Sequence, residues 1–252
     1  MRVLIYSDVH ANWQALEAMA AAVEGRCEVS LCLGDVVGYG ANPNQASDWV
    51  RAHSPVVIRG NHDRACALLD GIQWFNPVAA TAARWTHANL TPENAAWLQA
   101  LSAGPLPFHD FSLVHGSPLD EDEYLIEPAQ AAGAFAATTA ALHWFGHTHL
   151  QGGFTLADDQ VSAWTTVPPD AALSARHESV ALPLRPDARY LLNPGSVGQP
   201  RDGDWRAAFA ILDEQAGQVE FHRVPYDVAT AQARILEAGL PPRLAERLAK
   251  GK

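Results

Sequence analysis

The sequence predicts an α/β protein in which two sheets pack together and helices cover the outside. In the first half, short apolar runs alternate with stretches of helical spacing, which is typical of parallel strands joined by crossover helices. Beyond Gly152 several short strands follow one another, as in the hairpins of a second sheet. Neither an internal repeat nor a low-complexity linker divides the 252 residues, so we expect one domain over residues 1–252.

Local patterns justify each element in turn. The apolar run Arg2–Tyr6 predicts a buried strand, and Asn12 is a suitable cap for a helix in which Leu16, Met19 and Val23 recur at helical spacing. The other expected strands are 29–33, 55–58, 111–114, 142–145, 154–156, 161–165, 179–182, 190–192, 208–212 and 219–224. The other expected helical regions are 45–52, 66–102, 128–141, 227–237 and 242–248.

Composition excludes several classes of partner. The formal charge is −11 and no basic cluster interrupts it, which argues against strong binding to nucleic acid or to an anionic membrane. The N-terminal run Val3–Tyr6 is too short for a secretory signal, and no stretch approaches the ~20 apolar residues of a membrane span. Cys27, Cys32 and Cys66 form no CxxC pair, so we expect reduced thiols in a cytoplasmic protein. The oligomeric state is left open.

Potential metal ligands follow five of the predicted strands. Carboxylates, an amide oxygen and imidazoles suit two divalent cations that share one site, with one histidine left over for proton transfer. Each segment alone has an ordinary explanation, as a loop pair, a turn or a buried histidine. Together the five segments favour a metal-binding site over these ordinary roles. All of them lie at the carboxyl ends of predicted strands, where open α/β sheets place their functional sites. The residues are Asp8, His10, Asp35, Asn61, His62, His115, His147 and His149.

Spacing within two segments supports convergence. Asp8 and His10 are two residues apart, as are His147 and His149. In extended backbone such side chains point the same way, so we expect each pair to reach one ion. The glycine before Asp35 permits a tight backbone there.

These motifs resemble those of the calcineurin-like metallophosphoesterase superfamily, in its small bacterial and archaeal phosphodiesterase branch. The resemblance implies a four-layer α/β/β/α sandwich of two mixed sheets flanked by helices. The matching motifs are SDVH at 7–10, GDVVGYG at 34–40, GNHD at 60–63, HG at 115–116, GHTH at 146–149 and NPGSVGQPR at 193–201.

The resemblance also implies roles for the ligand residues. One metal would be held by Asp8, His10, Asp35 and His149. The second would be held by Asp35, Asn61, His115 and His147, so that Asp35 bridges the two. A hydroxide between the cations would attack phosphorus, and His62 would protonate the leaving oxygen as general acid. Asp63 or a backbone group would orient the His62 ring.

Departures from the superfamily's serine/threonine phosphatases favour a phosphodiesterase for small or nucleotide-like diesters. Those enzymes carry an arginine where this chain has Val37-Gly38-Tyr39-Gly40, and a glutamate in place of Asp63. Without that arginine, the dianionic phosphate of a monoester lacks one of its cationic contacts. A phosphomonoesterase or dinucleoside-polyphosphate hydrolase remains an alternative, whereas a nuclease for long DNA or RNA is disfavoured by the acidic balance. A non-catalytic scaffold, like the retromer subunit of this fold, would not need the intact ligand set.

Weaker signals concern the substrate and the metal. Tyr39 and Arg201 are candidates for substrate binding, and residues 193–196 read as a structural turn beneath the metals. The Pro- and Ala-rich segment 167–186 is a candidate insertion that overhangs the site and sets specificity. Nitrogen and oxygen ligands fit manganese, with iron, zinc, cobalt, nickel or magnesium as alternatives.

Overall fold

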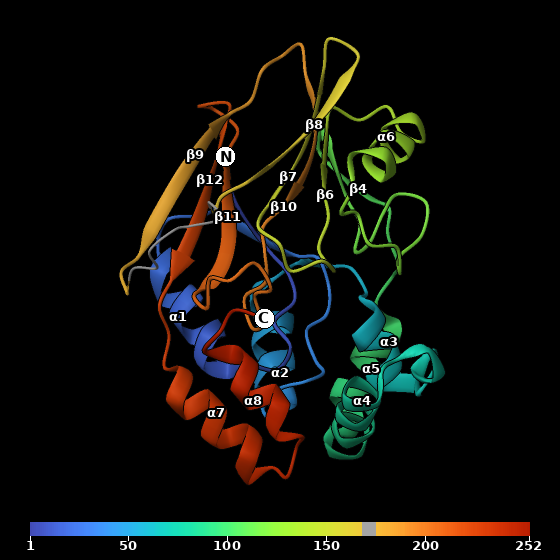
Figure 1. Ribbon diagram of the computed structural model, residues 1–252, viewed down its shortest axis with the longest axis vertical. Coiled ribbons are helices and arrows are strands. Elements are labelled where there is room, and N and C mark those ends of the chain that lie inside the picture. Colours follow the sequence, from blue (N-terminus) through green and yellow to red (C-terminus); the bar gives the residue numbers. More distant parts are fainter. Residues whose placement is uncertain (168–174) are drawn as a thin grey trace.

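The computed structural model describes residues 1–167 and 175–252 as two six-stranded mixed sheets flanked by helices (Figure 1). The strands are β1 (Arg2–Tyr6), β2 (Val29–Cys32), β3 (Val56–Val57), β4 (Leu106–Phe108), β5 (Phe111–Leu113), β6 (Leu142–Trp144), β7 (Gly152–Ala157), β8 (Gln160–Thr165), β9 (Glu178–Pro183), β10 (Arg189–Asn193), β11 (Ala207–Asp213) and β12 (Gln218–Val224). The helices are α1 (Trp13–Val23), α2 (Pro43–His53), α3 (Asn61–Leu68), the 3-10 helix η1 (Ile72–Trp74), α4 (Pro77–Asn89), α5 (Pro92–Ala100), α6 (Pro128–Ala136), α7 (Val228–Glu237) and α8 (Pro242–Leu248).

Each sheet has a parallel part and an antiparallel part. The first sheet runs β3-β2-β1-β11-β12-β9, and only β1, β2 and β3 are mutually parallel. The second runs β4-β5-β6-β10-β7-β8, with β5, β6 and β10 parallel. The parallel strands of the first sheet come from the first quarter of the chain, as the strand–helix alternation of the sequence predicts.

Successive residues of a strand point to opposite faces of its sheet, so each sheet contributes to two apolar cores. Three cores result, and they separate four layers of helices and sheets. Val3 and Ile5 of β1 point into the core between the sheets, whereas Leu4 and Tyr6 point into the core beneath the helices. In β10, Leu192 lies in the central core and Leu191 in a third core with Phe135 of α6. The predicted sandwich of two sheets with helices outside is confirmed.

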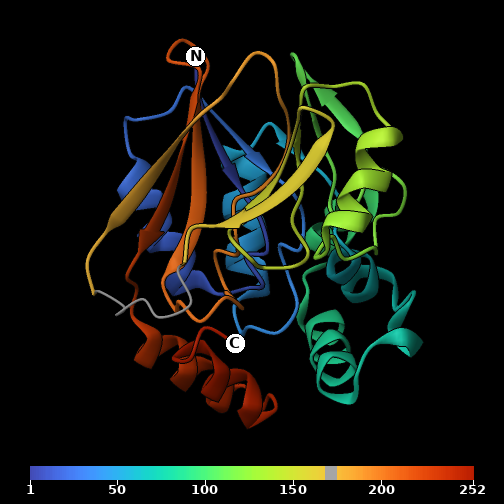
Figure 2. The same ribbon diagram turned by 45° about the horizontal axis from the view of Figure 1, so that its top comes forward.

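The helical layers lie on opposite sides of the sandwich. In both views α6 lies beside the second sheet, whereas α7 and α8 lie at the far side near α1 (Figures 1 and 2). Asn12 caps α1 by accepting a hydrogen bond from the Ala15 backbone N–H, as predicted. Thr91 caps α5 in the same way through Asn94.

Two parts of the chain differ from the sequence prediction. The predicted helical region 66–102 is broken at residues 69–76 by a left-handed residue, Leu69, and by the short helix η1. Strand β4 was not predicted, because its central Pro107 argues against a strand. It lies at the edge of the second sheet, where proline is tolerated.

The candidate insertion 167–186 falls partly outside the described residues, which omit 168–174. Its residues 178–183 form β9, which pairs with β12 at the edge of the first sheet. A role of this segment in specificity stays a prediction.

Cys27, Cys32 and Cys66 are free thiols, two of them buried, as expected from their spacing. Within the described ranges, no helix has the length and apolar character that crossing a bilayer requires.

Candidate metal centre

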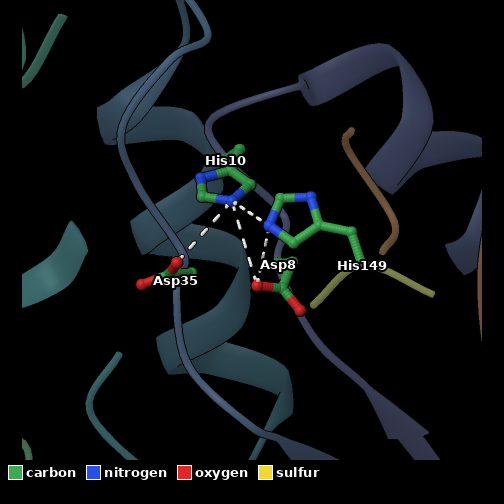
Figure 3. A group of neighbouring side chains, drawn as sticks. All are labelled: Asp8, His10, Asp35 and His149. Carbon is green, nitrogen blue, oxygen red and sulfur yellow. Dashed lines mark hydrogen bonds and ion pairs between the residues drawn. The ribbon is translucent and has the colours of Figure 1, made fainter. Parts of the chain in front are cut away.

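The predicted ligands converge into two adjacent groups that share one carboxylate. Asp8, His10, Asp35 and His149 form the first group, and each offers a nitrogen or oxygen within 4.8 Å of the others (Figure 3). Asp35 also belongs to the second group. The members of that second group are Asp35, His115 and His147.

Strand order explains this convergence. Asp8 and His10 follow β1, Asp35 follows β2, and Asn61 opens α3 after β3. His115 follows β5, and the His147–His149 segment follows β6. The carboxyl ends of parallel strands in both sheets therefore meet at one edge of the sandwich.

Backbone carbonyls fix the orientation of two rings in the first group. Nδ1 of His10 lies 3.1 Å from the Val37 oxygen, and Nδ1 of His149 lies 2.6 Å from the Gln199 oxygen. A carbonyl only accepts hydrogen bonds, so each Nδ1 carries the proton and Nε2 of the neutral ring presents a lone pair. The two Nε2 atoms lie 3.1 Å apart. Two facing lone pairs require a proton or a cation between or beside them.

The second group is oriented by the same device. Nδ1 of His115 lies 2.7 Å from the Leu33 oxygen, so its Nε2 faces Asp35 at 3.4 Å and the amide oxygen of Asn61 at 3.3 Å. In His147 the roles of the nitrogens are exchanged. Its Nε2 lies 3.1 Å from the Asp122 backbone oxygen, which leaves Nδ1 as the ring's ligand atom.

Two carboxylate oxygens face these rings without a hydrogen-bond donor. Oδ1 of Asp8 lies 3.2 Å from Nε2 of His149, and Oδ2 of Asp35 lies 3.6 Å from Nε2 of His10. Both oxygens are buried and lack a hydrogen-bond partner. A buried carboxylate oxygen without a donor is costly, and a divalent cation satisfies it. The donor set of carboxylates, imidazoles and an amide oxygen therefore fits divalent metals.

Electrostatics at the site also favours positive charge. Burial alone would raise the pKa of Asp8 and Asp35, but the neighbouring imidazoles, His149 and His115 foremost, hold both pKa values well below the usual range. Burial lowers the pKa of His115, yet the charges of Asp35 and Asp8 outweigh burial and raise that pKa to about 10. A cation bound here would replace the His115 proton.

Backbone strain is concentrated at the same residues. Asp8, His10, Asp35, His147 and His149 all have φ between 47° and 63°, in the left-handed region. The sequence argument from extended backbone is therefore wrong for both residue pairs, although each pair still converges. Such conformations cost of order 1–3 kcal/mol each and persist only where the surroundings enforce them.

The segment 193–196 supplies part of that enforcement. The Asn193 amide donates to the Gly146 oxygen at 2.8 Å and to the Thr148 hydroxyl at 3.0 Å. The Ser196 hydroxyl donates to the Asp8 backbone oxygen at 2.8 Å. These bonds tie both ligand loops to the segment 193–196, and a position of this segment beneath the metals stays a prediction.

His62 lies beside the ligands. Its ring is 4.9 Å from that of His10 and 4.3 Å from that of Tyr39, and its backbone N–H donates to Oδ1 of Asp35 at 2.8 Å. Burial lowers the pKa of His62 to about 4, against the charge of Asp35. Nδ1 of the ring is buried without a partner.

Asp63 does not orient the His62 ring, contrary to expectation. Its carboxylate accepts hydrogen bonds from the backbone N–H groups of Val37 and Gly60, at 3.2 and 3.1 Å. Asp63 thus fastens the start of α3 to the loop after Asp35. Gly38 shapes the space for His62 instead, because a Cβ on Gly38 would lie 2.5 Å from Nδ1 of His62.

Comparison with known proteins agrees with this geometry. The sequence profile of the calcineurin-like phosphoesterase superfamily domain matches residues 1–217. The chain belongs to this superfamily. As a member of this superfamily the protein is a hydrolase of phosphoesters, and its Asp/His cluster indicates a divalent metal centre.

Relatives of this calcineurin-like phosphoesterase match it over nearly its whole length. Uncharacterized protein MJ0912 of Methanocaldococcus jannaschii is 33% identical over 99% of this chain and 98% of its own. The crystal structure of a metallophosphoesterase from Sphaerobacter thermophilus has 39% identity and a TM-score of 0.84, covering 100% of this chain and 99% of that one. Hypothetical protein PH1004 of Pyrococcus horikoshii OT3 shares the fold at 21% identity and a TM-score of 0.75, covering 100% and 98%.

The two residues suggested for substrate binding lie next to each other in this calcineurin-like phosphoesterase. Nη2 of Arg201 lies 3.5 Å from the Tyr39 hydroxyl, and the Tyr39 ring packs against His10 with centroids 4.7 Å apart. Arg247 of α8 approaches the same ring, at 6.0 Å. Arg247 could not be anticipated, because nothing in the sequence of α8 connects it to the distant motifs.

Two aromatic residues beside the centre were also missed. The Phe75 ring lies 4.6 Å from that of His62, and the Tyr124 ring lies 3.9 Å from that of His147. For Phe75 the sequence contains one clue. The dipeptide Asn76-Pro77 predicts that a loop, with Phe75 in it, ends there and that a helix begins.

Proposed function

We propose that this protein is a phosphodiesterase that uses two divalent cations to hydrolyse small or nucleotide-like phosphodiesters. The observation that carries the proposal is the pair of buried ligand groups that share Asp35, with His62 beside them. Two-metal hydrolases hold their cations ~3.5–4 Å apart, and one carboxylate with two oxygens can reach both ions at that spacing.

Each ligand residue has a specific task in this proposal. Asp8, His10 and His149 hold one cation and Asn61, His115 and His147 hold the other, while Asp35 contributes to both. Cations bound there would supply activated water and neutralise negative charge on the phosphoryl oxygens. The carbonyl bonds to the imidazoles keep each ligand nitrogen aimed at its ion without reorganisation.

His62 serves as the proton donor to the leaving oxygen. The hydrogen bond from its backbone N–H to Asp35 ties its position to the metal bridge. Its lowered pKa means that the ring is neutral in the free protein at pH 7. Negative charge from an anionic substrate next to the ring would raise this pKa and favour the protonated form that donates.

The loop after Asp35 favours a diester over a monoester. Val36 and Val37 are fully buried in the helix-side core, so this loop presents no cation to a dianionic phosphate. Arg201, beside Tyr39, is then an arginine close to the site that could contact an anionic oxygen. A phosphomonoesterase or dinucleoside-polyphosphate hydrolase is the second candidate, because the same ligand groups would serve it.

Manganese and a cytoplasmic location belong to the proposal. Carboxylate, amide and imidazole ligands without thiolate suit manganese, with iron, zinc, cobalt, nickel or magnesium as alternatives. Three free thiols are consistent with a reducing compartment.

Hydrolysis of bis(p-nitrophenyl) phosphate and p-nitrophenyl phosphate by chelated protein, with one metal restored at a time, tests the proposal. We expect turnover to require the metal and the diester to be preferred in kcat/KM. Equal turnover after thorough chelation would refute the metal mechanism, and a preference for the monoester would select the second candidate.

A further inference from the structure

A cavity of about 320 Å³ opens beside the metal centre, and several aromatic side chains line it among polar ones. The residues on its inner side are His62, Asn61 and His147, which belong to the proposed site. The outer walls include Tyr39, Trp74, Phe75 and Tyr124. We propose that this cavity, here called the aromatic pocket, binds the flat base of a nucleoside that forms the leaving group of the substrate.

Two of the aromatic rings, those of Phe75 and Tyr124, pack against residues of the site. Phe75 packs on His62 with centroids 4.6 Å apart, and Tyr124 packs on His147 with centroids 3.9 Å apart. The first contact fixes the Phe75 ring next to His62, the proposed proton donor. The second fixes the Tyr124 ring next to His147, a proposed metal ligand. A planar group entering the pocket meets rigid rings instead of mobile side chains, which lowers the entropy cost of binding.

Trp74 gives a second, independent indication. Its side chain is 84% exposed, although tryptophan is among the most favourable residues to bury. It ends the short helix η1, at the rim of the pocket. An exposed indole at the mouth of a cavity is a stacking platform, because every nucleobase offers a π face to it.

Charge in the pocket argues against a second phosphate as the occupant. Arg64 is the one arginine or lysine that lines it. Its guanidinium is already engaged by Glu121 and by Asp122, the latter at 2.6 Å, and it lies 3.7 Å from Asp70. Among the described lining residues no lysine or arginine is thus available to an anion, so a neutral aromatic group fits better.

The position of His62 identifies which part of the substrate enters. The inference rests on the proposed function at this point, since it takes His62 as the proton donor. A proton donor lies next to the leaving oxygen, and His62 forms part of the pocket wall. The group attached to the leaving oxygen is therefore the group that occupies the aromatic pocket. The volume lies at the lower end of small-molecule sites, ~300–1,000 Å³, and suits one nucleoside.

Calorimetric titration of the manganese-loaded protein with AMP and with ribose 5-phosphate tests this inference, because the two ligands differ only in the base. We expect AMP to bind about 5-fold to 150-fold more tightly, the ratio that stacking of ~1–3 kcal/mol per base supplies. Trp74→Ala should reduce most of that ratio while leaving the affinity for ribose 5-phosphate unchanged. Trp74→Phe, which retains a ring, should keep most of it. Leu236→Ala, at a residue 53% exposed on α7, is the control for a lost surface side chain.

The outcomes separate this inference from the proposed function. Affinities of AMP and ribose 5-phosphate within about 2-fold, or an AMP preference that Trp74→Ala leaves intact, would overturn the aromatic pocket even if diester hydrolysis is confirmed. Conversely, a base preference that depends on Trp74 would support the pocket even if bis(p-nitrophenyl) phosphate is not hydrolysed.

Discussion

The Nε2 atoms of His10 and His149 lie 3.1 Å apart, while the Nδ1 atom of each ring faces a backbone carbonyl oxygen. The carbonyls place the protons on Nδ1, so two lone pairs point at one spot beside the oxygens of Asp8 and Asp35. This arrangement is unfavourable for the protein alone and favourable around a cation. The predictions below follow from it.

Metal binding should stabilise the fold strongly. With each ion at ~100 times its Kd, binding adds ~2.7 kcal/mol per site. At ~2–4 °C per kcal/mol for a chain of this size, the melting temperature should rise on the order of 10–20 °C between chelated and manganese-loaded protein. Differential scanning calorimetry with and without chelator measures this shift.

Asp35→Asn should abolish most of that rise. Asparagine keeps the oxygen that accepts from the His62 N–H, but it removes the buried charge shared by both ligand groups. The chelated variant should melt below the chelated parent, because the charge of Asp35 and the proton on His115 stabilise each other in the metal-free protein. A variant that gains as much from manganese as the parent does would contradict the bridging role.

Replacing His62 should separate catalysis from metal binding. His62→Ala removes the proposed proton donor and should lower kcat for diesters by ~10²–10⁴. Metal content by mass spectrometry should stay the same, because the ring is not among the ligand groups. His109→Ala, at an exposed histidine, serves as the control and should retain parental kcat. Loss of metal in His62→Ala would show that the residue is a ligand.

Gly38→Ala should impair activity through the His62 ring. A Cβ there would lie 2.5 Å from Nδ1 of His62, and φ is +90°. Gly203→Ala is a matched control, since φ is +87° and nothing lies within 4 Å of the added carbon. Both variants should lose about 1–2 kcal/mol of stability from left-handed strain. Only Gly38→Ala should lose turnover, and equal activity in the two variants would exclude the positioning effect.

Acid should destabilise the protein through His143. Burial, with Arg189 adding to it, lowers the pKa of this imidazole to about 4. The unfolded chain binds the proton near pH 6.5 and the folded chain does not, so stability falls as pH drops from about 6.5 toward 4. Between pH 7 and pH 5 this histidine should account for about 1–2 kcal/mol. Urea unfolding of chelated parent and His143→Gln tests this, and equal pH dependence in both would refute it.

The sequence predicted the site residues but not their backbone. Ligands placed after β1, β2, β3, β5 and β6 could be anticipated, because strand ends in a parallel arrangement meet at one edge. Left-handed conformations at Asp8 and His10 could not, since these residue types adopt them more often than most but only in a small minority of positions. They are imposed by tertiary bonds such as that from Ser196 to the Asp8 oxygen.

Residues whose role depends on packing alone were beyond sequence reasoning. Tyr124 and Arg247 lie on segments without a motif and reach the centre only because their loop and helix pack against it. Asp63 was one of two groups expected to orient the His62 ring, whereas its carboxylate joins α3 to the loop after Asp35. The helical spacing of apolar residues also predicted one continuous helical region where the chain breaks at residues 69–76. Part of that segment lines the aromatic pocket.

The most direct test of the central claim is the electron paramagnetic resonance spectrum of chelated protein titrated with manganese. We expect two ions per chain, with the spectrum of an exchange-coupled pair appearing as the second ion binds, because cations that share Asp35 lie ~4 Å apart. Binding of a single ion, or of two ions with the spectra of isolated manganese, would contradict the shared-carboxylate centre.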